Sequence, residues 1–323
     1  MKILVVGGAG YIGSHMVREL LDKGFDPLVL DNLSTGHAWA VPEGRLIEGD
    51  LADRDGLDRL FAGHDFGAVM HFASFIQVGE SVTAPLKYYQ NNVANTLNLL
   101  SAMERGGVKR FVFSSTAAVY GTPETVPVVE TAPLRPENPY GHSKLMIEQV
   151  LADCGHAWGL QSACLRYFNA AGAHPSGEIG EAHDPESHLI PIILQAALGR
   201  RDVITINGED YDTPDGTCIR DYIHVCDLAS AHTLALQALL DGKGSLTCNL
   251  GNGTGYSIRE VIEVCRKVTG RTIPVATGPR RPGDPARLVA SAGKLVTEFG
   301  WKPQYADLES IVETAWRWMM RQF

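Results

Sequence analysis

Short apolar runs alternate with longer amphipathic segments through the first half of the chain. The runs have the length of buried strands, and the segments between them carry apolar residues at helical spacing. This alternation is typical of a parallel sheet covered by helices on both faces. We therefore expect strands at 2–6, 26–31, 45–48, 68–72, 110–114 and 163–167, and helices at 13–23, 55–61, 85–105 and 139–155.

The pattern changes after about residue 170. Segments rich in Gly, Pro, His and Asp, at 171–186, 207–216 and 277–285, replace the clean alternation. We predict a doubly wound α/β domain over 1–170 and a smaller C-terminal α/β domain over 171–323. Strands near 221–225 and 247–250 are candidates to rejoin the first sheet.

Composition and charge narrow the classes of function. Of 323 residues, 45% are hydrophobic and 20% charged, and 28 basic against 37 acidic residues give a net charge of −9. No overall positive field is available for nucleic acid or an anionic membrane, so we expect neither as a partner. No apolar run approaches the ~20 residues of a spanning helix, which favours a cytoplasmic protein. The six cysteines form no CxxC pair and His15, His71 and His224 lack metal-ligand spacing, so neither disulfides nor a metal site are expected.

A glycine-rich turn follows the first expected strand. Gly7, Gly10 and Gly13 have the spacing that lets backbone approach a pyrophosphate at a helix N-terminus. Asp31 ends the second expected strand, where a carboxylate binds the hydroxyls of an adenosine ribose and favours NAD over NADP. A purely structural turn, with Asp31 as a turn cap, is the alternative. Asp50 and Leu51 end the third expected strand, where an adenine could be contacted.

A tyrosine and a lysine stand one helical turn apart in the second half of this domain. Asn138 and Pro139 are a typical helix start, which places Tyr140 and Lys144 on one face. An ammonium near a phenol stabilises the phenolate, so the pair could take a proton from a sugar hydroxyl. Such a pair alone is more often a solvated surface feature. Together with a dinucleotide loop it predicts a catalytic pair.

Hydroxyl side chains follow the expected strand at 110–114. Ligands bind beyond the carboxyl ends of parallel strands, so Thr116 is expected to hydrogen-bond the substrate hydroxyl. Capping of the strand end is the alternative for these hydroxyls.

The order of glycine loop, Ser/Thr segment and Tyr-x-x-x-Lys resembles the extended short-chain dehydrogenase/reductases. Within that family the chain is similar to the UDP-glucose 4-epimerases nearly from end to end. The motifs that carry this resemblance lie at 7–15, 31–33, 71–73, 78–81, 89–92, 139–144, 166–169, 172–177 and 220–225.

The resemblance implies a Rossmann NAD-binding domain, a UDP-sugar-binding domain and a homodimer built through the helices at 85–105 and 139–153. It implies that NAD takes a hydride from C4 of a UDP-hexose and returns it to the other face of a 4-keto sugar. The catalytic roles fall on Tyr140, Lys144 and Thr116. The implied cofactor contacts are Gly7, Gly10, Tyr11, Ile12, Gly13, Asp31, Asn32, Asp50, Leu51, Phe72, Ala73, Asn91, Lys144 and Phe168. The implied substrate contacts are Thr116, Asn169, Leu189, Arg220, Arg281 and Asp284. The two arginines also supply the local positive charge that a pyrophosphate needs in an acidic protein.

Three positions depart from relatives. Ile76 stands where some relatives have lysine, and His188 where many have asparagine, so these two contacts are not carried over. Leu288 occupies a position that is tyrosine in relatives restricted to unmodified hexoses and small in those accepting N-acetylhexosamines. We hypothesise that the pocket admits UDP-N-acetylglucosamine at least weakly.

Alternative functions share parts of this chemistry. A 4,6-dehydratase would need an acid and a base where the chain has Ala117 and Ala118. A UDP-uronate or UDP-pentose 4-epimerase shares the mechanism and differs in its contacts to C6. An NAD-sensing regulatory protein would have no chemical need for both Tyr140 and Lys144.

Overall fold

The computed structural model describes residues 1–281 and 284–322. The chain forms two compact units. Unit 1 consists of Met1–Gly121, Leu134–Arg166 and Ala229–Cys248, and unit 2 of Thr122–Pro133, Tyr167–Leu228 and Asn249–Phe323. Among the residues that the structure describes, no helix is both long enough and apolar enough to cross a membrane.

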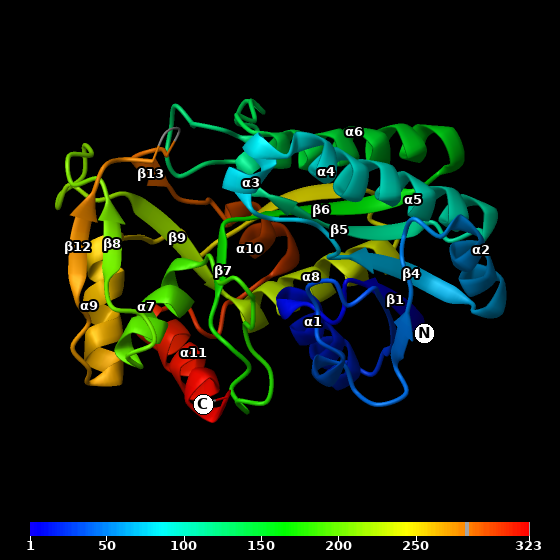
Figure 1. The fold of residues 1–323 in the computed structure, drawn as a ribbon. Helices are drawn as coiled ribbons and strands as arrows, with labels where there is room; N and C mark the ends of the chain where they lie inside the picture. Colours follow the sequence, from blue (N-terminus) through cyan, green and yellow to red (C-terminus); the bar gives the residue numbers. More distant parts are fainter. Residues whose placement is uncertain (282–283, 323) are drawn as a thin grey trace. The chain divides into compact units, whose positions relative to one another are not determined.

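A seven-stranded sheet forms the centre of unit 1, with the strand order β10-β6-β5-β4-β1-β2-β3 (Figure 1). β1 pairs in parallel with β2 and with β4, and the pairs β2–β3 and β4–β5 are parallel as well. The strand order reverses between β1 and β4, and ligands of such folds bind at this switch point. The prediction of a doubly wound α/β Rossmann fold is confirmed. The elements up to β6 are β1 (Lys2–Val6), α1 (Tyr11–Asp22), β2 (Asp26–Asp31), η1 (Ala38–Ala40), β3 (Leu46–Glu48), α2 (Arg54–Gly63), β4 (Phe66–His71), α3 (Val78–Thr83), α4 (Pro85–Tyr88), η2 (Tyr89–Ala94), α5 (Asn95–Arg105), β5 (Arg110–Thr116), η3 (Ala117–Val119), α6 (Pro139–Trp158) and β6 (Gln161–Tyr167).

Helices cover both faces of this sheet. Figure 1 shows α4, α5 and α6 along one face, and α1 and α8 (Val225–Leu240) along the other. On the α5–α6 face, Leu99 and Ile147 are buried against strand residues such as Val69 and Phe111. The apolar faces of the strands and of the helices thus pack into one core. This core holds in place the strand ends at which the site is built.

The expected helix at 85–105 is divided in the structure. α4 is followed by the π-helical segment η2 and then by α5. The side chain of Asn92, within η2, accepts a hydrogen bond from the backbone N–H of Phe75 and donates to Ser143 Oγ. A π turn inserted into an α-helix often marks a functional position, and here it lies beside the loop that follows β4.

The described residues of unit 2 form two small sheets. In the first, β9 (Ile219–His224) pairs with β11 (Gly255–Ser257), β13 (Arg287–Leu288) and β7 (Asn169–Ala171). In the second, β8 (Ile204–Asn207) pairs in parallel with β12 (Val275–Gly278). The helices of this unit are α7 (Leu189–Ala197), α9 (Ile258–Thr269), α10 (Gly293–Phe299) and α11 (Leu308–Gln322).

The two candidate returning strands end in different sheets. β10 (Leu246–Leu250) joins the edge of the seven-stranded sheet next to β6. Residues 221–225 add no strand there, because β9 forms the middle of the first small sheet. The buried carboxylate of Asp221 in β9 accepts backbone hydrogen bonds from Asn252, Gly253 and Ala290, which fix the neighbouring segments of unit 2 around it.

Candidate functional site

The glycine turn after β1 is shaped by close backbone approach. Gly7 has φ +78°, and a Cβ placed on it would lie 2.5 Å from the backbone nitrogen of Ala73. A Cβ on Gly13 would lie 2.1 Å from the carbonyl oxygen of Gly7. Only glycine fits both positions, and α1 begins directly after this turn, at Tyr11, with its N-terminal N–H groups beside the glycines.

Asp31 is held at the end of β2 by backbone donors. Its Oδ2 accepts a hydrogen bond from Ala9 N at 2.9 Å and its Oδ1 one from Leu33 N at 2.9 Å. Nearby, Asn32 Nδ2 donates to Asp50 Oδ2 at 2.7 Å. The carboxyl ends of parallel strands lie at one edge of the sheet, so the residues that follow β2 and β3 can contact one another there.

A hollow lies at this edge of the sheet, and we refer to it as the glycine-loop hollow. The predicted cofactor residues that line it are Gly7, Gly10, Asp31, Asn32, Asp50, Leu51, Phe72, Ala73 and Asn91. The glycine cradle and a carboxylate at the ribose position fit the pyrophosphate and ribose of NAD. Tyr11, Ile12 and Gly13 lie at the start of α1, next to the loop that lines this hollow. Phe168 belongs to unit 2.

Tyr140 and Thr116 meet at the start of α6. Asn138 caps this helix, accepting a hydrogen bond from Gly141 N at 2.9 Å. Tyr140 is only 8% exposed, and its hydroxyl is hydrogen-bonded with Thr116. Thr116 Oγ1 also accepts a hydrogen bond from Ala118 N at 3.1 Å, so this side chain caps the short helix η3 that follows β5.

Lys144 is buried one turn further along α6. Its Nζ donates to Ser74 Oγ and to the carbonyl oxygen of Ser114, each at 2.8 Å. It lies 6.0 Å from the centroid of the Tyr140 ring. Burial lowers the pKa of Lys144 to about 7, although the negative charge of Glu148 opposes this shift.

The expected lowering of the Tyr140 pKa is not what the protein alone produces. Burial raises the pKa of Tyr140, and the hydrogen bond with Thr116 offsets part of that rise. The spacing of phenol and ammonium along the helix does not reveal that both groups are buried away from water. Desolvation disfavours the charged phenolate, so the pKa falls only when further positive charge is brought to the buried oxygen.

Several supporting side chains were not expected from the sequence. Ser74 accepts from Lys144, and Ser143 Oγ donates to the carbonyl oxygen of Tyr140 at 2.7 Å. The carboxylate of Glu148 accepts a hydrogen bond from Ser115 Oγ, next to Thr116, and forms an ion pair with Arg166. The position of Glu148, four residues after Lys144, could have been noticed in the sequence. Its partners Ser115 and Arg166 could not, because they lie on strands that are distant along the chain.

The predicted substrate residues of unit 2 lie mainly around β9. Arg220 Nη2 donates to Asp284 Oδ1 at 2.5 Å, and Asn169 Nδ2 donates to the carbonyl oxygen of Asp221 at 2.7 Å. Leu288, on β13, is the register partner of Arg220. Leu189 is the first residue of α7, and Arg281 is exposed. The structure thus brings Arg220, Asp284 and Leu288 together.

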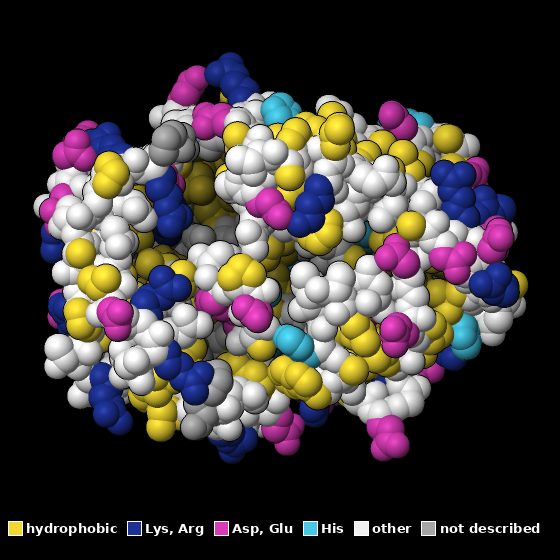
Figure 2. Space-filling model, viewed as in Figure 1, with side chains coloured by type: hydrophobic (Ala, Val, Ile, Leu, Met, Phe, Trp, Pro, Cys, Tyr) yellow, Lys and Arg dark blue, Asp and Glu magenta, His cyan; other side chains and the backbone are white. Residues whose placement is uncertain are grey.

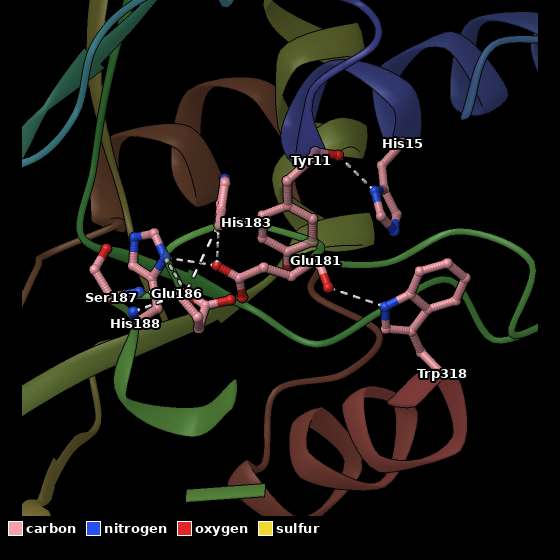
Figure 3. A network of polar contacts seen from close by, with 8 residues as sticks. All are labelled: Tyr11, His15, Glu181, His183, Glu186, Ser187, His188 and Trp318. Atoms are coloured by element: carbon pink, nitrogen blue, oxygen red, sulfur yellow. Dashed lines mark hydrogen bonds and ion pairs between the residues drawn. The ribbon is translucent and has the colours of Figure 1, made fainter. Parts of the chain in front are cut away.

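A second polar cluster, Glu181, His183, Glu186 and His188, was not expected from the sequence, and we call it the Glu/His cluster (Figure 3). His183 Nδ1 lies 3.0 Å and His188 Nδ1 2.6 Å from Glu181 Oε1. Burial alone would lower the histidine pKa values, but the two carboxylates outweigh it and raise the pKa of His183 to about 9 and of His188 to about 10. The spacing Glu-x-His-x-x-Glu-x-His was the signal that could have found it.

Figure 3 also shows His15, one turn into α1, with its Nδ1 2.7 Å from the carbonyl oxygen of Tyr11. His71 is fully buried, and Thr96 Oγ1 lies 3.3 Å from its Nε2. Burial and the charge of Lys144 lower the pKa of His71 to about 3, so this imidazole is neutral in the folded protein.

The Rossmann sheet, glycine cradle and buried Tyr140–Lys144 pair define a dinucleotide-binding enzyme of the α/β class. The sequence profile of the NAD dependent epimerase/dehydratase family matches residues 3–251. The chain belongs to this family, and NAD is its cofactor. The resemblance to UDP-glucose 4-epimerases is confirmed by full-length relatives.

One such relative, a UDP-glucose 4-epimerase from Halalkalibacterium halodurans, is 56% identical over 98% of this chain and 95% of its own length. A crystal structure of UDP-glucose 4-epimerase from Brucella ovis in complex with NAD has a TM-score of 0.95 and 49% identity, covering 98% of this chain and 97% of that chain. The UDP-Glc/GlcNAc 4-epimerase from Campylobacter jejuni has a TM-score of 0.87 and 46% identity, covering 99% of both chains.

Proposed function

We propose that this protein interconverts UDP-glucose and UDP-galactose by NAD-dependent epimerisation at C4 of the hexose. The observation that carries the proposal is the buried pair Tyr140–Lys144, with Thr116 hydrogen-bonded to the phenol, in the unit that holds the glycine-loop hollow. When bound, NAD supplies a hydride acceptor that gives the hydride back, so the sugar passes through a 4-keto state with no net redox change.

Tyr140 is the residue that exchanges the proton of the C4 hydroxyl. Its pKa is raised by burial, so it favours the protonated phenol until positive charge stabilises the phenolate. Lys144 is held on the same helix face by its contacts with Ser74 and Ser114, and an oxidised nicotinamide would add the further positive charge. Thr116 orients the substrate hydroxyl toward the phenol oxygen.

Substrate binding is assigned to residues of unit 2. Arg220 presents a guanidinium that is mostly buried, with 11% of its side chain exposed, and Asp284 fixes its orientation. Arg281 adds an exposed guanidinium from the same segment as Asp284. A guanidinium matches the geometry of pyrophosphate oxygens, so these residues are assigned to the UDP moiety, together with Asn169 and Leu189.

The decisive experiment combines identification of the bound nucleotide with removal of the phenol oxygen of Tyr140. Purified protein is denatured, the released nucleotide is identified, and conversion of UDP-galactose to UDP-glucose is measured without added cofactor. We expect NAD in the supernatant, and Tyr140→Phe to lower kcat by about 10²–10⁴-fold while it retains the nucleotide.

The matched control is Tyr88→Phe, which changes another buried tyrosine of unit 1, whose hydroxyl bonds the carbonyl oxygen of Gln77. It should keep kcat within about threefold. Turnover of Tyr140→Phe within tenfold of the unmodified protein would refute the assignment of Tyr140.

A second substrate class has one structural argument in its favour. Leu288 lies beside Arg220 in the parallel pairing of β13 and β9, next to the residue assigned to the pyrophosphate. Leucine is shorter than tyrosine, which leaves room for the acetamido group of UDP-N-acetylglucosamine. The Campylobacter jejuni relative is described as acting on both sugars.

We also propose that the enzyme works as a homodimer through α3, α4, α5 and α6 of unit 1. Figure 2 shows hydrophobic side chains gathered over this group of helices. The exposed large apolar residues on them are Val78, Val82, Leu86, Leu97 and Met146, with 45, 62, 79, 40 and 41% exposure. Apolar side chains of adjacent helices exposed in one chain are typical of a face that a second copy covers.

The oligomeric state tests this proposal. Leu86→Asp should shift the mass measured by light scattering toward that of a monomer, whereas Met320→Asp, at an exposed apolar position on α11, should not. A monomeric unmodified protein at micromolar concentration would refute the dimer. A cytoplasmic location completes the proposal, since no cysteine in the described part of the chain takes part in a disulfide bond.

A further inference from the structure

We propose that Glu181, His183, Glu186 and His188 form a structural binding site for one divalent transition-metal ion, with Zn²⁺ the best match. The site lies in unit 2 and uses none of the residues assigned to catalysis. Its four side chains come from eight consecutive residues between β7 and α7.

The donor set is the first argument. Two imidazoles and two carboxylates are the nitrogen and oxygen ligands that suit zinc, and four protein ligands are typical of a structural site. Two carboxylates and two neutral imidazoles together carry a charge of −2, which a divalent ion balances. In the metal-free protein the same atoms balance one another as ion pairs.

The distances are the second argument. The four ligand atoms all lie within 4.8 Å of one another. His188 Nδ1 lies 2.6 Å from Glu181 Oε1 and 3.3 Å from Glu186 Oε1, and His183 Nδ1 lies 3.0 and 3.8 Å from the same two atoms. Ligands about 2.0–2.1 Å from a tetrahedral zinc are roughly 3.3 Å apart, which is in the middle of this range.

The support around the ligands is the third argument. Glu186 Oε1 accepts backbone hydrogen bonds from Ser187 and His188, at 2.8 and 2.9 Å. The carbonyl oxygen of Glu181 accepts from the indole N–H of Trp318 at 3.0 Å. Such outer contacts orient metal ligands before the ion binds.

The two carboxylates of the site are buried, whereas its two imidazoles are partly exposed to solvent. The carboxylates of Glu181 and Glu186 are 5% and 4% exposed, whereas the imidazoles of His183 and His188 are 23% and 39% exposed. Two carboxylates at this depth need positive charge beside them. The half-exposed histidines leave a path by which an ion reaches them.

The ion would fix the segment that leads into α7. His188 is the N-cap residue of this helix, and the next residues, Ile190, Ile193 and Leu194, are buried in the core of unit 2. A metal at the Glu/His cluster would therefore hold the start of α7 and stabilise unit 2, without taking part in the chemistry at C4.

The test is a zinc titration of untagged protein, since a histidine tag would itself bind the ion. Chelator-treated protein is titrated with Zn²⁺ alone against a chromophoric chelator. We expect about one tight equivalent per chain, a higher Tm on zinc addition, and at least tenfold weaker binding in His183→Ala, His188→Ala and Glu186→Gln. His174→Ala, a histidine of the same unit outside the cluster, should bind as the unmodified protein does.

X-ray absorption separates this site from cysteine binding. The zinc edge should show only nitrogen and oxygen neighbours at about 2.0–2.1 Å, whereas a thiolate would appear at about 2.3 Å. A sulfur signal would overturn the proposal, as would a dissociation constant weaker than about 10 μM at neutral pH or unchanged binding in the His183→Ala/His188→Ala double variant. Glu186→Gln keeps the shape of the side chain, so it serves if the alanine variants fail to fold. None of these readouts depends on epimerase activity.

Discussion

The guanidinium of Arg166 lies against the carboxylate of Glu148, with Nη2 2.5 Å from Oε2 and with 6% and 8% of the two side chains exposed. Glu148 lies one turn after Lys144 on α6, and it also accepts a hydrogen bond from Ser115 Oγ at 2.5 Å. Arg166 Nη1 donates to the hydroxyl of Tyr120 at 2.9 Å. The ion pair therefore ties the helix of the Tyr140–Lys144 pair to β6, and the hydrogen bond from Ser115 ties the same helix to the end of β5, which carries Thr116.

Breaking this buried ion pair should be costly. Arg166→Met leaves the carboxylate of Glu148 buried without its partner, which should lower the free energy of unfolding by about 3–5 kcal/mol. Urea unfolding at neutral pH measures the change. The control is Arg105→Met, because the ion pair of Arg105 with Asp58 is 55% and 46% exposed, and the expected loss is under about 1 kcal/mol. Similar losses in the two variants would contradict the structural role of the buried pair.

Alanine variants of two glycines with the same φ angle should distinguish the cost of backbone strain from an effect on the nucleotide site. Gly7 and Gly24 both have φ +78°, but a Cβ on Gly7 would meet Ala73 N at 2.5 Å, and a Cβ on Gly24 would meet nothing within 4 Å. Gly24→Ala should cost roughly 1 kcal/mol of stability and leave the NAD content unchanged.

Gly7→Ala should in addition lose most of its bound NAD, because the turn must open to admit the methyl group. The nucleotide content per chain, measured after denaturation, is the readout. Full occupancy in Gly7→Ala would show that the close approach to Ala73 does not shape the cofactor site.

Acid sensitivity should depend on His71. Its pKa is about 3 when folded, against an ordinary value of 6.5, so below 6.5 the unfolded chain binds a proton that the folded chain does not. Stability from this group is therefore full above pH 6.5 and falls by about 1.4 kcal/mol per pH unit as the pH drops toward 3.

Between pH 7 and pH 5, the unmodified protein should lose about 2 kcal/mol more than His71→Leu does. The comparison uses urea unfolding at both pH values, with His156→Gln, an exposed position in the last turn of α6, as control. Equal pH dependence in His71→Leu and the unmodified protein would mean that other groups dominate acid unfolding.

Substrate range should respond to Leu288. Leu288→Tyr should lower kcat/KM for UDP-N-acetylglucosamine at least about tenfold and leave that for UDP-glucose within about threefold, because the larger ring takes the space of the acetamido group. Leu288→Ala should shift the ratio the other way. Arg287→Ala, at the adjacent exposed position, is the control. Parallel changes for both sugars would show that Leu288 does not read the substituent at C2.

Much of unit 1 could be predicted because its signals are local. The apolar alternation gave the strands and most helices, and the cap at Asn138 fixed the start of α6 and so the common face of Tyr140 and Lys144. The division of the helix at 85–105 could not be predicted in this way, since Asn92 turns toward Phe75 and Ser143, which are distant in sequence. Resemblance, rather than periodicity, supplied the substrate residues of unit 2.

By itself, the sequence determined the order of most strands and helices of unit 1, the glycine turn and the four-residue spacing of phenol and ammonium, because these depend on neighbours along the chain. Only the tertiary structure decided how deeply those groups are buried and which distant partners they meet. Burial sets the pKa of Tyr140 above and that of Lys144 below its ordinary value, and strand pairing brings Leu288 beside Arg220. Desolvation and long-range contact are properties of the packed chain, and no local pattern of residues encodes them.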